Sequence, residues 1–209
     1  EEAQGVPVGI DVCSVSTQAV IMTDGEIFAY GNMRTGSDSP NSARKGLDFA
    51  LEKTDMHESR IDYCIGTGYG RVNVPMADRT LTEIACHARG ANFLYGPQIR
   101  TVLDVGGQDM KAIALADDGS VREFAMNDKC AAGTGRFFEA MSRIFRMDLD
   151  EFSKLSLSAR KTIPVTAQCS VFAETEVISL LAKRNPPADI AAGIQNAVGR
   201  RCFPLLRRV

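Results

Sequence analysis

The sequence predicts an α/β fold built on an internal duplication. Two stretches of this 209-residue chain, one around Asp11 and one around Asp104, read as an apolar strand, a turn of small residues and a second apolar strand. The second stretch follows the first at an offset of 93 residues, the spacing between these two aspartates. Repetition of such a unit indicates two similar halves that face one another. Other matched pairs are Val12 with Val105, Ala19 with Ala112 and Asp24 with Asp117.

The elements of the first half follow from the periodicity of apolar residues. The first helix is expected to begin at Pro40, because proline suits the first turn of a helix, and Leu47, Ala50 and Leu51 then lie on one face. We expect strands near residues 8–13, 18–23, 26–33 and 61–66, and helices near residues 40–53 and 77–91.

The second half opens on the repeated unit and continues as helices. We expect strands near residues 100–105, 109–116 and 120–125, and helices near residues 135–145, 149–155, 170–183 and 189–206. Residues 1–125 therefore hold the first half together with the start of the second copy of the unit. Residues 126–209 form the mainly helical part of the second half.

Each copy of the unit places an aspartate, Asp11 or Asp104, at the end of an apolar strand and beside small residues. Amides in such a turn can bind phosphate oxygens, and a carboxylate can hold magnesium directly or through its waters. One copy alone is explained by ordinary turn chemistry. Two copies at matching places favour a phosphate clamp, which suits a nucleotide.

Two cysteines, Cys130 and Cys169, stand where predicted helices begin. Free amide donors and the positive end of the helix dipole stabilise a thiolate there, so both places suit an anionic metal cluster. Two thiolates are only half of a four-thiolate site. A second subunit would bring the other half, and the metal would then lie on a dimer axis.

Several segments, in chain order, resemble one protein family. The chain resembles the BadF/BadG/BcrA/BcrD-type ATPases, which include the activators of 2-hydroxyacyl-CoA dehydratases and the ATPase subunits of benzoyl-CoA reductases, within the acetate kinase, sugar kinase, Hsp70 and actin superfamily. Tyr69-Gly70-Arg71 and Met33-Arg34-Thr35-Gly36 look closest to the benzoyl-CoA reductase side. The segments that carry the resemblance are residues 66–71, 83–91, 104–109, 126–137 and 171–178.

The resemblance implies a duplicated ribonuclease-H-like fold and an ATPase coupled to electron transfer. It implies a homodimer or paralogous heterodimer that bridges one [4Fe-4S] cluster, with Cys130 and Cys169 as ligands. ATP, ADP and Mg²⁺ are the further cofactors. Reduced ferredoxin or flavodoxin is the expected electron donor, and a separate reductase or dehydratase component is the expected acceptor.

Catalytic roles are expected for Asp104 and Gln108, because water attack on a γ-phosphate needs an orienting polar group and magnesium needs oxygen ligands. The carboxylates and small residues of the two loops, together with the glycines after Cys130, are expected to bind the nucleotide. These residues are Asp11, Ser14, Ser16, Gly106, Gly107, Asp109, Gly133, Thr134 and Gly135.

The first loop departs from the family pattern. That pattern is Asp-x-Gly-Ser/Thr with a lysine a few residues later, whereas this chain has Cys13 and Gln18, which align with Gly106 and Lys111 of its own second copy. A side chain at Cys13 is expected to crowd the phosphates, or to demand a backbone angle that glycine adopts more easily. Loss of the lysine removes a positive charge near a polyphosphate. Weaker, slower or altered nucleotide binding is therefore expected.

Two other classes of function stay open. The chain starts at Glu1 and stops at Val209, and the superfamily's second half normally continues with an adenosine-binding part, so a fragment or truncated chain is expected. That feature, with Cys13 and Gln18, favours a non-catalytic cluster-carrying or assembly subunit whose nucleotide site is degenerate. A sugar or acid kinase is disfavoured, because no substrate-binding base is evident and kinases do not need paired cysteines at helix starts.

Composition agrees with a cytoplasmic enzyme. Hydrophobic residues make up 44% of the chain, enough for a core, and the net charge of −2 gives no reason to expect nucleic acid. No apolar run is long enough to cross a bilayer. Six cysteines outside a short secreted framework indicate reduced thiols. The remaining polar and sulfur groups are expected to pack or be solvated rather than to react: Cys64, Cys86, Cys202, His57 and His87.

Overall fold

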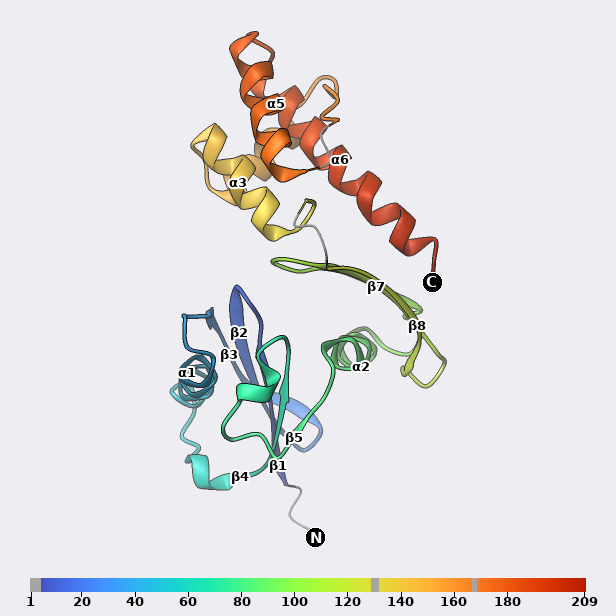
Figure 1. The fold of residues 1–209 in the computed structure, drawn as a ribbon. Helices are drawn as coiled ribbons and strands as arrows, with labels where there is room; N and C mark the ends of the chain where they lie inside the picture. Colours follow the sequence, from blue (N-terminus) through green and yellow to red (C-terminus); the bar gives the residue numbers. More distant parts are fainter. Residues whose placement is uncertain (1–4, 129–131, 167–168) are drawn as a thin grey trace. The chain divides into compact units, whose positions relative to one another are not determined.

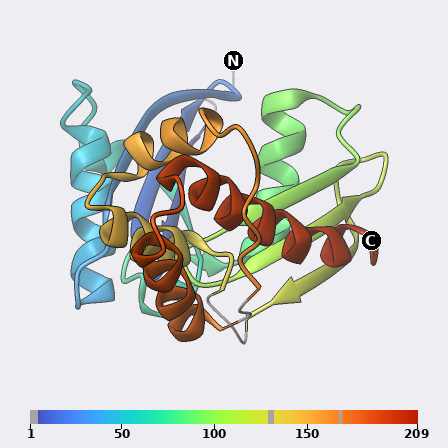
Figure 2. The ribbon, with the colours of Figure 1, turned by 90° about the horizontal axis from the view of Figure 1, so that it is seen from above.

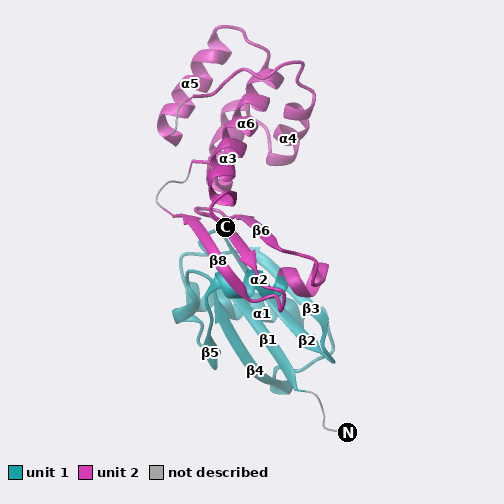
Figure 3. Ribbon diagram, turned by 90° about the vertical axis from the view of Figure 1, so that its right-hand side faces the viewer, with its two compact units in different colours: residues 1–90 teal, residues 91–209 magenta. Residues whose placement is uncertain are grey.

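The computed structural model describes residues 5–128, 132–166 and 169–209. The chain divides into two compact units, residues 1–90 and residues 91–209, and each is described by itself (Figures 1 and 3). The predicted division of the two halves at residue 125 stays a prediction.

Unit 1 is built on a five-stranded sheet. Its strands are β1 (Val6–Val12), β2 (Ser16–Thr23), β3 (Glu26–Arg34), β4 (Ile61–Thr67) and β5 (Arg79–Thr80), in the order β3-β2-β1-β4-β5. The first three strands are antiparallel neighbours, whereas β4 runs parallel to β1. Apolar side chains alternate along β1, and Val6, Val8, Ile10 and Val12 are all buried. This alternation is the pattern of a strand with one face on a core.

Helix α1 (Ser39–Leu51) packs against β2 and β3 (Figure 2). Asp38 caps it by accepting a hydrogen bond from the Asn41 amide at 3.2 Å, and Pro40 lies in its first turn, as predicted. Leu47 and Ala50 are buried against the sheet. Short 3₁₀ turns at Glu58–Arg60 and Arg71–Asn73 flank β4.

The helix predicted from residue 77 begins later, as α2 (Glu83–Tyr95). The segment before α2 instead pairs with β4 as the parallel strand β5. Asp78 makes this difference, because its backbone amide donates to the Cys64 carbonyl at 2.8 Å and its carboxylate accepts the Cys64 amide at 2.7 Å. Tertiary hydrogen bonds therefore override the helical pattern of residues 77–82.

Unit 2 repeats the opening hairpin of unit 1. Its strands β6 (Thr101–Val105), β7 (Met110–Leu115) and β8 (Val121–Asn127) form a three-stranded antiparallel sheet in that order. Asp104 lies opposite Lys111, as Asp11 lies opposite Gln18, so the two hairpins share one register under the offset of 93 residues. The register shifts between Ile21 and Met22 and between Ala114 and Leu115 also match. The duplication inferred from sequence thus extends to the strand pairing.

Four helices complete the described part of unit 2: α3 (Gly135–Phe145), α4 (Leu149–Leu157), α5 (Ser170–Ala182) and α6 (Pro187–Leu206). Their predicted positions are confirmed to within a few residues. Helix α6 contacts β7 and β8 (Figure 2), and its buried residues share one core with α3, α4 and α5. Phe137, Phe152 and Ile194 are among the largest fully buried side chains, and all three belong to that core.

In the described ranges, no helix is both long enough and apolar enough to cross a bilayer. The predicted cytoplasmic location stays a prediction.

Candidate functional site

The first candidate loop joins β1 to β2 in unit 1. Its backbone is closed by the Cys13 amide, which donates to the Ser16 carbonyl at 3.0 Å. Asp11 is half-buried at the end of β1, and Ser14 and Ser16 are half-buried in and after the loop. The structure therefore gathers the predicted residues of the first copy in one turn.

The loop that follows β4 packs onto this turn. Gly68, directly after β4, has φ +85°, and a Cβ at this position would overlap Asp11 Oδ1 and the Val12 carbonyl. The Gly70 amide donates to that same carbonyl at 2.8 Å. Gly68 is thus required both by its backbone angle and by the close approach of its backbone to the carboxylate.

Cys13 directs its thiol to Asp11, donating to Oδ1 over 3.2 Å. Burial, and then the negative charge of Asp11, raise the pKa of Cys13 to about 12, so the group is a neutral thiol at physiological pH. The thiol occupies one oxygen of the carboxylate that was predicted to serve magnesium. This contact supports the expectation that the first loop handles nucleotide differently from a loop with glycine at this position.

Gln18 uses its side-chain amide within the sheet. Nε2 donates to Ser16 Oγ at 2.7 Å and to Asn32 Oδ1 at 3.2 Å. It therefore ties the start of β2 to β3, and it adds no positive charge where the second copy has Lys111.

The protonation of Cys13 can be tested by its reactivity. The pKa of Cys13 is about 12, against 9.0 for an ordinary cysteine. Between pH 7 and 9 the thiolate fraction of Cys13 is therefore lower than that of an ordinary cysteine by about a factor of 1,000. We expect the rate of Cys13 alkylation, followed by peptide mass spectrometry, to keep rising beyond pH 10 in the folded protein. In urea the same peptide should show an inflection near pH 9. A folded-state inflection near pH 9 would contradict this account, and a purely steric block would lower the rate without moving the inflection.

The second candidate loop joins β6 to β7 and surrounds a buried cation. Lys111 is 2% exposed, and its Nζ lies 2.7 Å from Asp109 Oδ1 and 3.3 Å from Asp104 Oδ2. The two carboxylates are partly exposed, so each has one side towards Lys111 and another towards solvent. Such oxygen donors fit the chemistry of Mg²⁺. Gln108 is exposed in the same loop.

The start of α3 is fixed to this loop. The amides of Gly135 and Arg136 donate to the carbonyls of Gly106 and Gly107 at 2.9 and 3.1 Å. Thr134, the N-cap residue, is buried. The structure thus brings the predicted residues Gly133–Gly135 next to the second loop, although two helix amides are already engaged by loop carbonyls. Any phosphate contact would use other donors.

The two candidate metal ligands differ in what can be said of them. Cys130 lies outside the described residues, and α3 begins five positions after it, at Gly135. Cys169 is the exposed N-cap residue of α5, as predicted, and the first turn of that helix contains no acidic residue. An accessible thiol at the positive end of a helix fits a thiolate ligand of an iron–sulfur cluster. Within the described ranges, no three metal-ligating side chains form a metal site.

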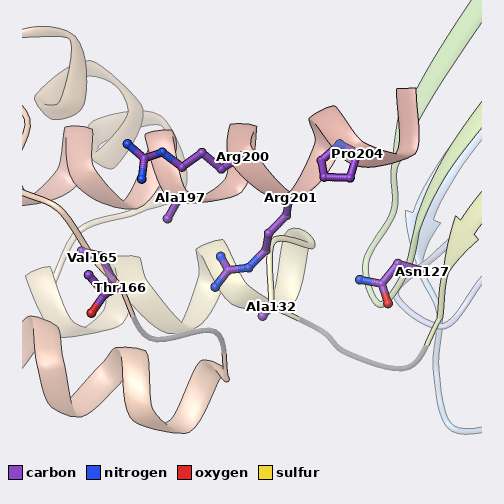
Figure 4. Close-up of a pocket in the computed structure, with 8 residues that line it drawn as sticks. All are labelled: Asn127, Ala132, Val165, Thr166, Ala197, Arg200, Arg201 and Pro204. Atoms are coloured by element: carbon purple, nitrogen blue, oxygen red, sulfur yellow. The ribbon is translucent and has the colours of Figure 1, made fainter. Parts of the chain in front are cut away.

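A pocket of about 530 Å³ lies in unit 2 between α6, the end of β8 and the segments that lead to the two cysteines (Figure 4). Arg201 extends from α6 towards Ala132, and its guanidinium lies 5.4 Å from the centre of the Phe137 ring. Arg200, its neighbour in α6, also lines the pocket but extends in a different direction from Arg201. The sequence did not single out these arginines, because only the fold brings α6 beside residues near Cys130 and Cys169. The described lining residues are Asn127, Ala132, Val165, Thr166, Ala197, Arg200, Arg201 and Pro204.

The expectations for the other cysteines are confirmed. Cys64 and Cys202 are buried, and Cys86 is half-buried. His57 is exposed and accepts the Ser59 amide at 3.3 Å, capping a 3₁₀ turn. His87 is half-buried in α2, next to Cys86 in sequence.

Glu176 of α5 forms a contact that the sequence analysis did not identify. Its carboxylate accepts the Thr166 amide at 3.0 Å and the Thr166 hydroxyl at 2.9 Å. It therefore binds the chain that precedes α5 rather than the first turn of the helix. No sequence signal marks this contact, because its partners stand ten positions apart in the chain.

Two solved structures with similar folds come from dehydratase systems. The component A of (R)-2-hydroxyglutaryl-CoA dehydratase from Acidaminococcus fermentans has a TM-score of 0.93 at 38% identity, covering 99% of this chain and 79% of that one. The activator of 2-hydroxyisocaproyl-CoA dehydratase from Clostridium difficile, with bound ADPNP, has a TM-score of 0.90 at 38% identity, covering 97% and 75%. The predicted fold class, an α/β fold of the actin-like ATPases, is confirmed.

Sequence relatives agree with this result. The activator of lactoyl-CoA dehydratase from Anaerotignum propionicum is 45% identical over 201 residues, 96% of this chain and 77% of that protein. A benzoyl-CoA reductase subunit from Thauera aromatica is 30% identical over 209 residues, 98% and 73%. Identity is thus higher on the dehydratase side than on the side that Tyr69-Gly70-Arg71 indicated. Because the model of the BadF/BadG/BcrA/BcrD ATPase family also matches residues 8–209, the chain belongs to that family of ATPases.

Proposed function

We propose that this chain is the ATP-hydrolysing activator of a 2-hydroxyacyl-CoA dehydratase and passes an electron to a separate dehydratase component. The observation that carries this proposal is the similarity, along nearly the whole chain, to a protein named as such an activator. Two hairpin loops of equal register, each with an aspartate at its strand end, support the ATPase part.

Each loop supplies residues that bind the nucleotide. Asp11, Ser14 and Ser16 serve it from the first loop, and Gly106, Gly107 and Asp109 from the second, with Gly133, Thr134 and Gly135 beside the second. Asp104 and its neighbours would hold Mg²⁺, which would offset the charge of the transferred phosphoryl group. Gln108 orients the attacking water. Lys111, between Asp104 and Asp109, holds the two carboxylates in place without closing their exposed sides.

Cys130 and Cys169 of each of two protomers would together hold one [4Fe-4S] cluster. The exposure of Cys169 and its place at the start of α5 support this assignment. The cluster would supply one-electron transfer between reduced ferredoxin or flavodoxin and the dehydratase component. ATP and ADP bind the two units with different free energies. This difference limits how far ATP hydrolysis can change the surroundings of the cluster.

Reconstitution tests the proposal. Anaerobically purified protein, a reductant, ATP and a purified dehydratase component are mixed with a 2-hydroxyacyl-CoA, and the dehydrated product is measured. We expect product only when the protein and hydrolysable ATP are both present, with ADPNP as the matched control. Equal product with ADPNP, or no ATP turnover, would instead favour a cluster-carrying subunit with a degenerate nucleotide site, which Cys13 and Gln18 already suggest.

A role within a benzoyl-CoA reductase is the second candidate. The similarity to a subunit of such an enzyme and the Tyr69-Gly70-Arg71 segment favour it. Replacing the dehydratase component by a benzoyl-CoA reductase component in the same assay distinguishes the two acceptors.

A further inference from the structure

Residues 159–166, which precede Cys169 in the chain, are irregular but closely bound. We call residues 159–166 the strap; it contains neither helix nor strand. Its first part is held by Asp189, a residue of α6 that is 3% exposed, whose Oδ1 accepts the amides of Arg160 and Lys161 at 2.9 and 3.2 Å. The Ile163 amide donates to the Asp189 carbonyl at 3.0 Å. The strap is thus bound to the first turn of α6.

The middle of the strap packs directly on α6. A Cβ at Gly193 would overlap the Ile163 carbonyl oxygen, so the helix has a glycine where the strap crosses it. Val165 is buried, and it joins the core formed by the helices of unit 2. Val165 and Thr166 also line the pocket in Figure 4. An irregular segment held at this many points behaves as part of the scaffold.

Glu176 holds the last described residue of the strap. Both of its carboxylate oxygens lie 3.0 Å from the Thr166 amide nitrogen, and Oε1 also accepts the Thr166 hydroxyl at 2.9 Å. Glu176 belongs to the second turn of α5, the helix that Cys169 caps. Hydrogen bonds to an ionised carboxylate are stronger than neutral ones. The chain that enters α5 is therefore clamped back onto α5 itself.

We infer that Glu176 is a positioning residue for Cys169, an inference that rests on the proposed cluster. Only two residues separate Thr166 from Cys169, and each spans at most about 3.6 Å. Clamping Thr166 therefore restricts the positions that the entry to α5 can adopt. Release of the clamp frees the end of the strap, and the Cys169 thiolate then leaves the metal more often. Glu176 does not touch the cluster; it acts through Thr166.

The test compares Glu176→Gln with Glu174→Gln. Both variants remove one negative charge from α5, but no hydrogen bond between Glu174 and the strap occurs among the described residues. Iron release from anaerobically purified protein to an iron(II) chelator is followed by absorbance. We expect Glu176→Gln to release iron about tenfold faster than the parent protein, the size of one hydrogen bond to a charged group. Glu174→Gln should match the parent protein.

A second variant and a second measurement check that Glu176 acts through Thr166. Thr166→Val removes the hydroxyl contact but keeps the amide contact, so it should give an intermediate rate even if Glu176→Gln folds poorly. Hydrogen exchange should show faster exchange of the Thr166 amide in Glu176→Gln, with α6 unchanged. Equal iron release from Glu176→Gln and Glu174→Gln, or parental rates in both Glu176→Gln and Thr166→Val, overturn the inference alone. A parent protein without iron overturns the cluster proposal and this inference together.

Discussion

Replacing Cys169 or Cys130 by alanine is expected to abolish the iron content of the anaerobically purified protein. The proposed cluster has four thiolate ligands, two from each protomer, so one substitution removes two ligands from every dimer. A cluster bound by the remaining two thiolates is not retained through purification. Iron should fall from about four atoms per dimer to near zero, and the paramagnetic resonance signal of the reduced cluster should vanish with it.

Cys86→Ala provides the matched control. Cys86 is a half-buried thiol in α2, and its loss should leave the iron content unchanged. Thermal unfolding of each variant shows whether the fold persists without metal. Full iron content in Cys169→Ala would refute the ligand assignment. A parent preparation that is monomeric, free of iron and properly folded would refute the shared cluster.

Asp104→Asn is expected to lower ATP turnover on the order of 100- to 1,000-fold, the usual cost of losing one preorganised electrostatic group. The substitution keeps the shape of the side chain but removes the charge that serves Mg²⁺ in the proposed site. Lys111 keeps its 2.7 Å contact with Asp109, so the loop should remain folded. The measurement is phosphate release under saturating ATP, with iron content as an independent readout that should not change.

Asp117→Asn is the control for this variant. Asp117 matches Asp24 in the internal repeat, and its side chain is 96% exposed in the turn between β7 and β8. Its ATP turnover should equal that of the parent protein. If Asp104→Asn also keeps parental turnover, Asp104 has no catalytic role. If the parent protein itself lacks turnover, the cluster-carrying alternative with a degenerate nucleotide site gains support.

Most elements could be predicted because their signals are local. Alternating apolar residues predicted β1, and the proline at the start of α1 marked its first turn. The helix predicted from residue 77 failed for a non-local reason, since Asp78 forms two hydrogen bonds with Cys64 on a neighbouring strand. A periodic pattern describes what a segment can form alone, and tertiary hydrogen bonds can outweigh it.

Some features of the candidate site could likewise be predicted from the sequence, and others could not. The repeat located Asp11 and Asp104 without any structure, because an offset is a property of the sequence. It also located Cys13 and Gln18 as departures, but not what they do: the thiol donates to Asp11 and the amide ties β2 to β3. These contacts depend on rotamers and strand pairing, and the sequence contains neither directly.

By itself, the sequence determined the duplicated α/β architecture, the membership of an ATPase family and the candidate loops. Periodicity, repeats and motif order are all properties of the linear sequence. Only the tertiary structure decided that Lys111 is buried between two carboxylates and that Glu176 clamps Thr166. The contacts of Lys111 with Asp104 and of Glu176 with Thr166 join residues seven and ten positions apart. They therefore exist only when folding has overcome the chain entropy that separates the partners.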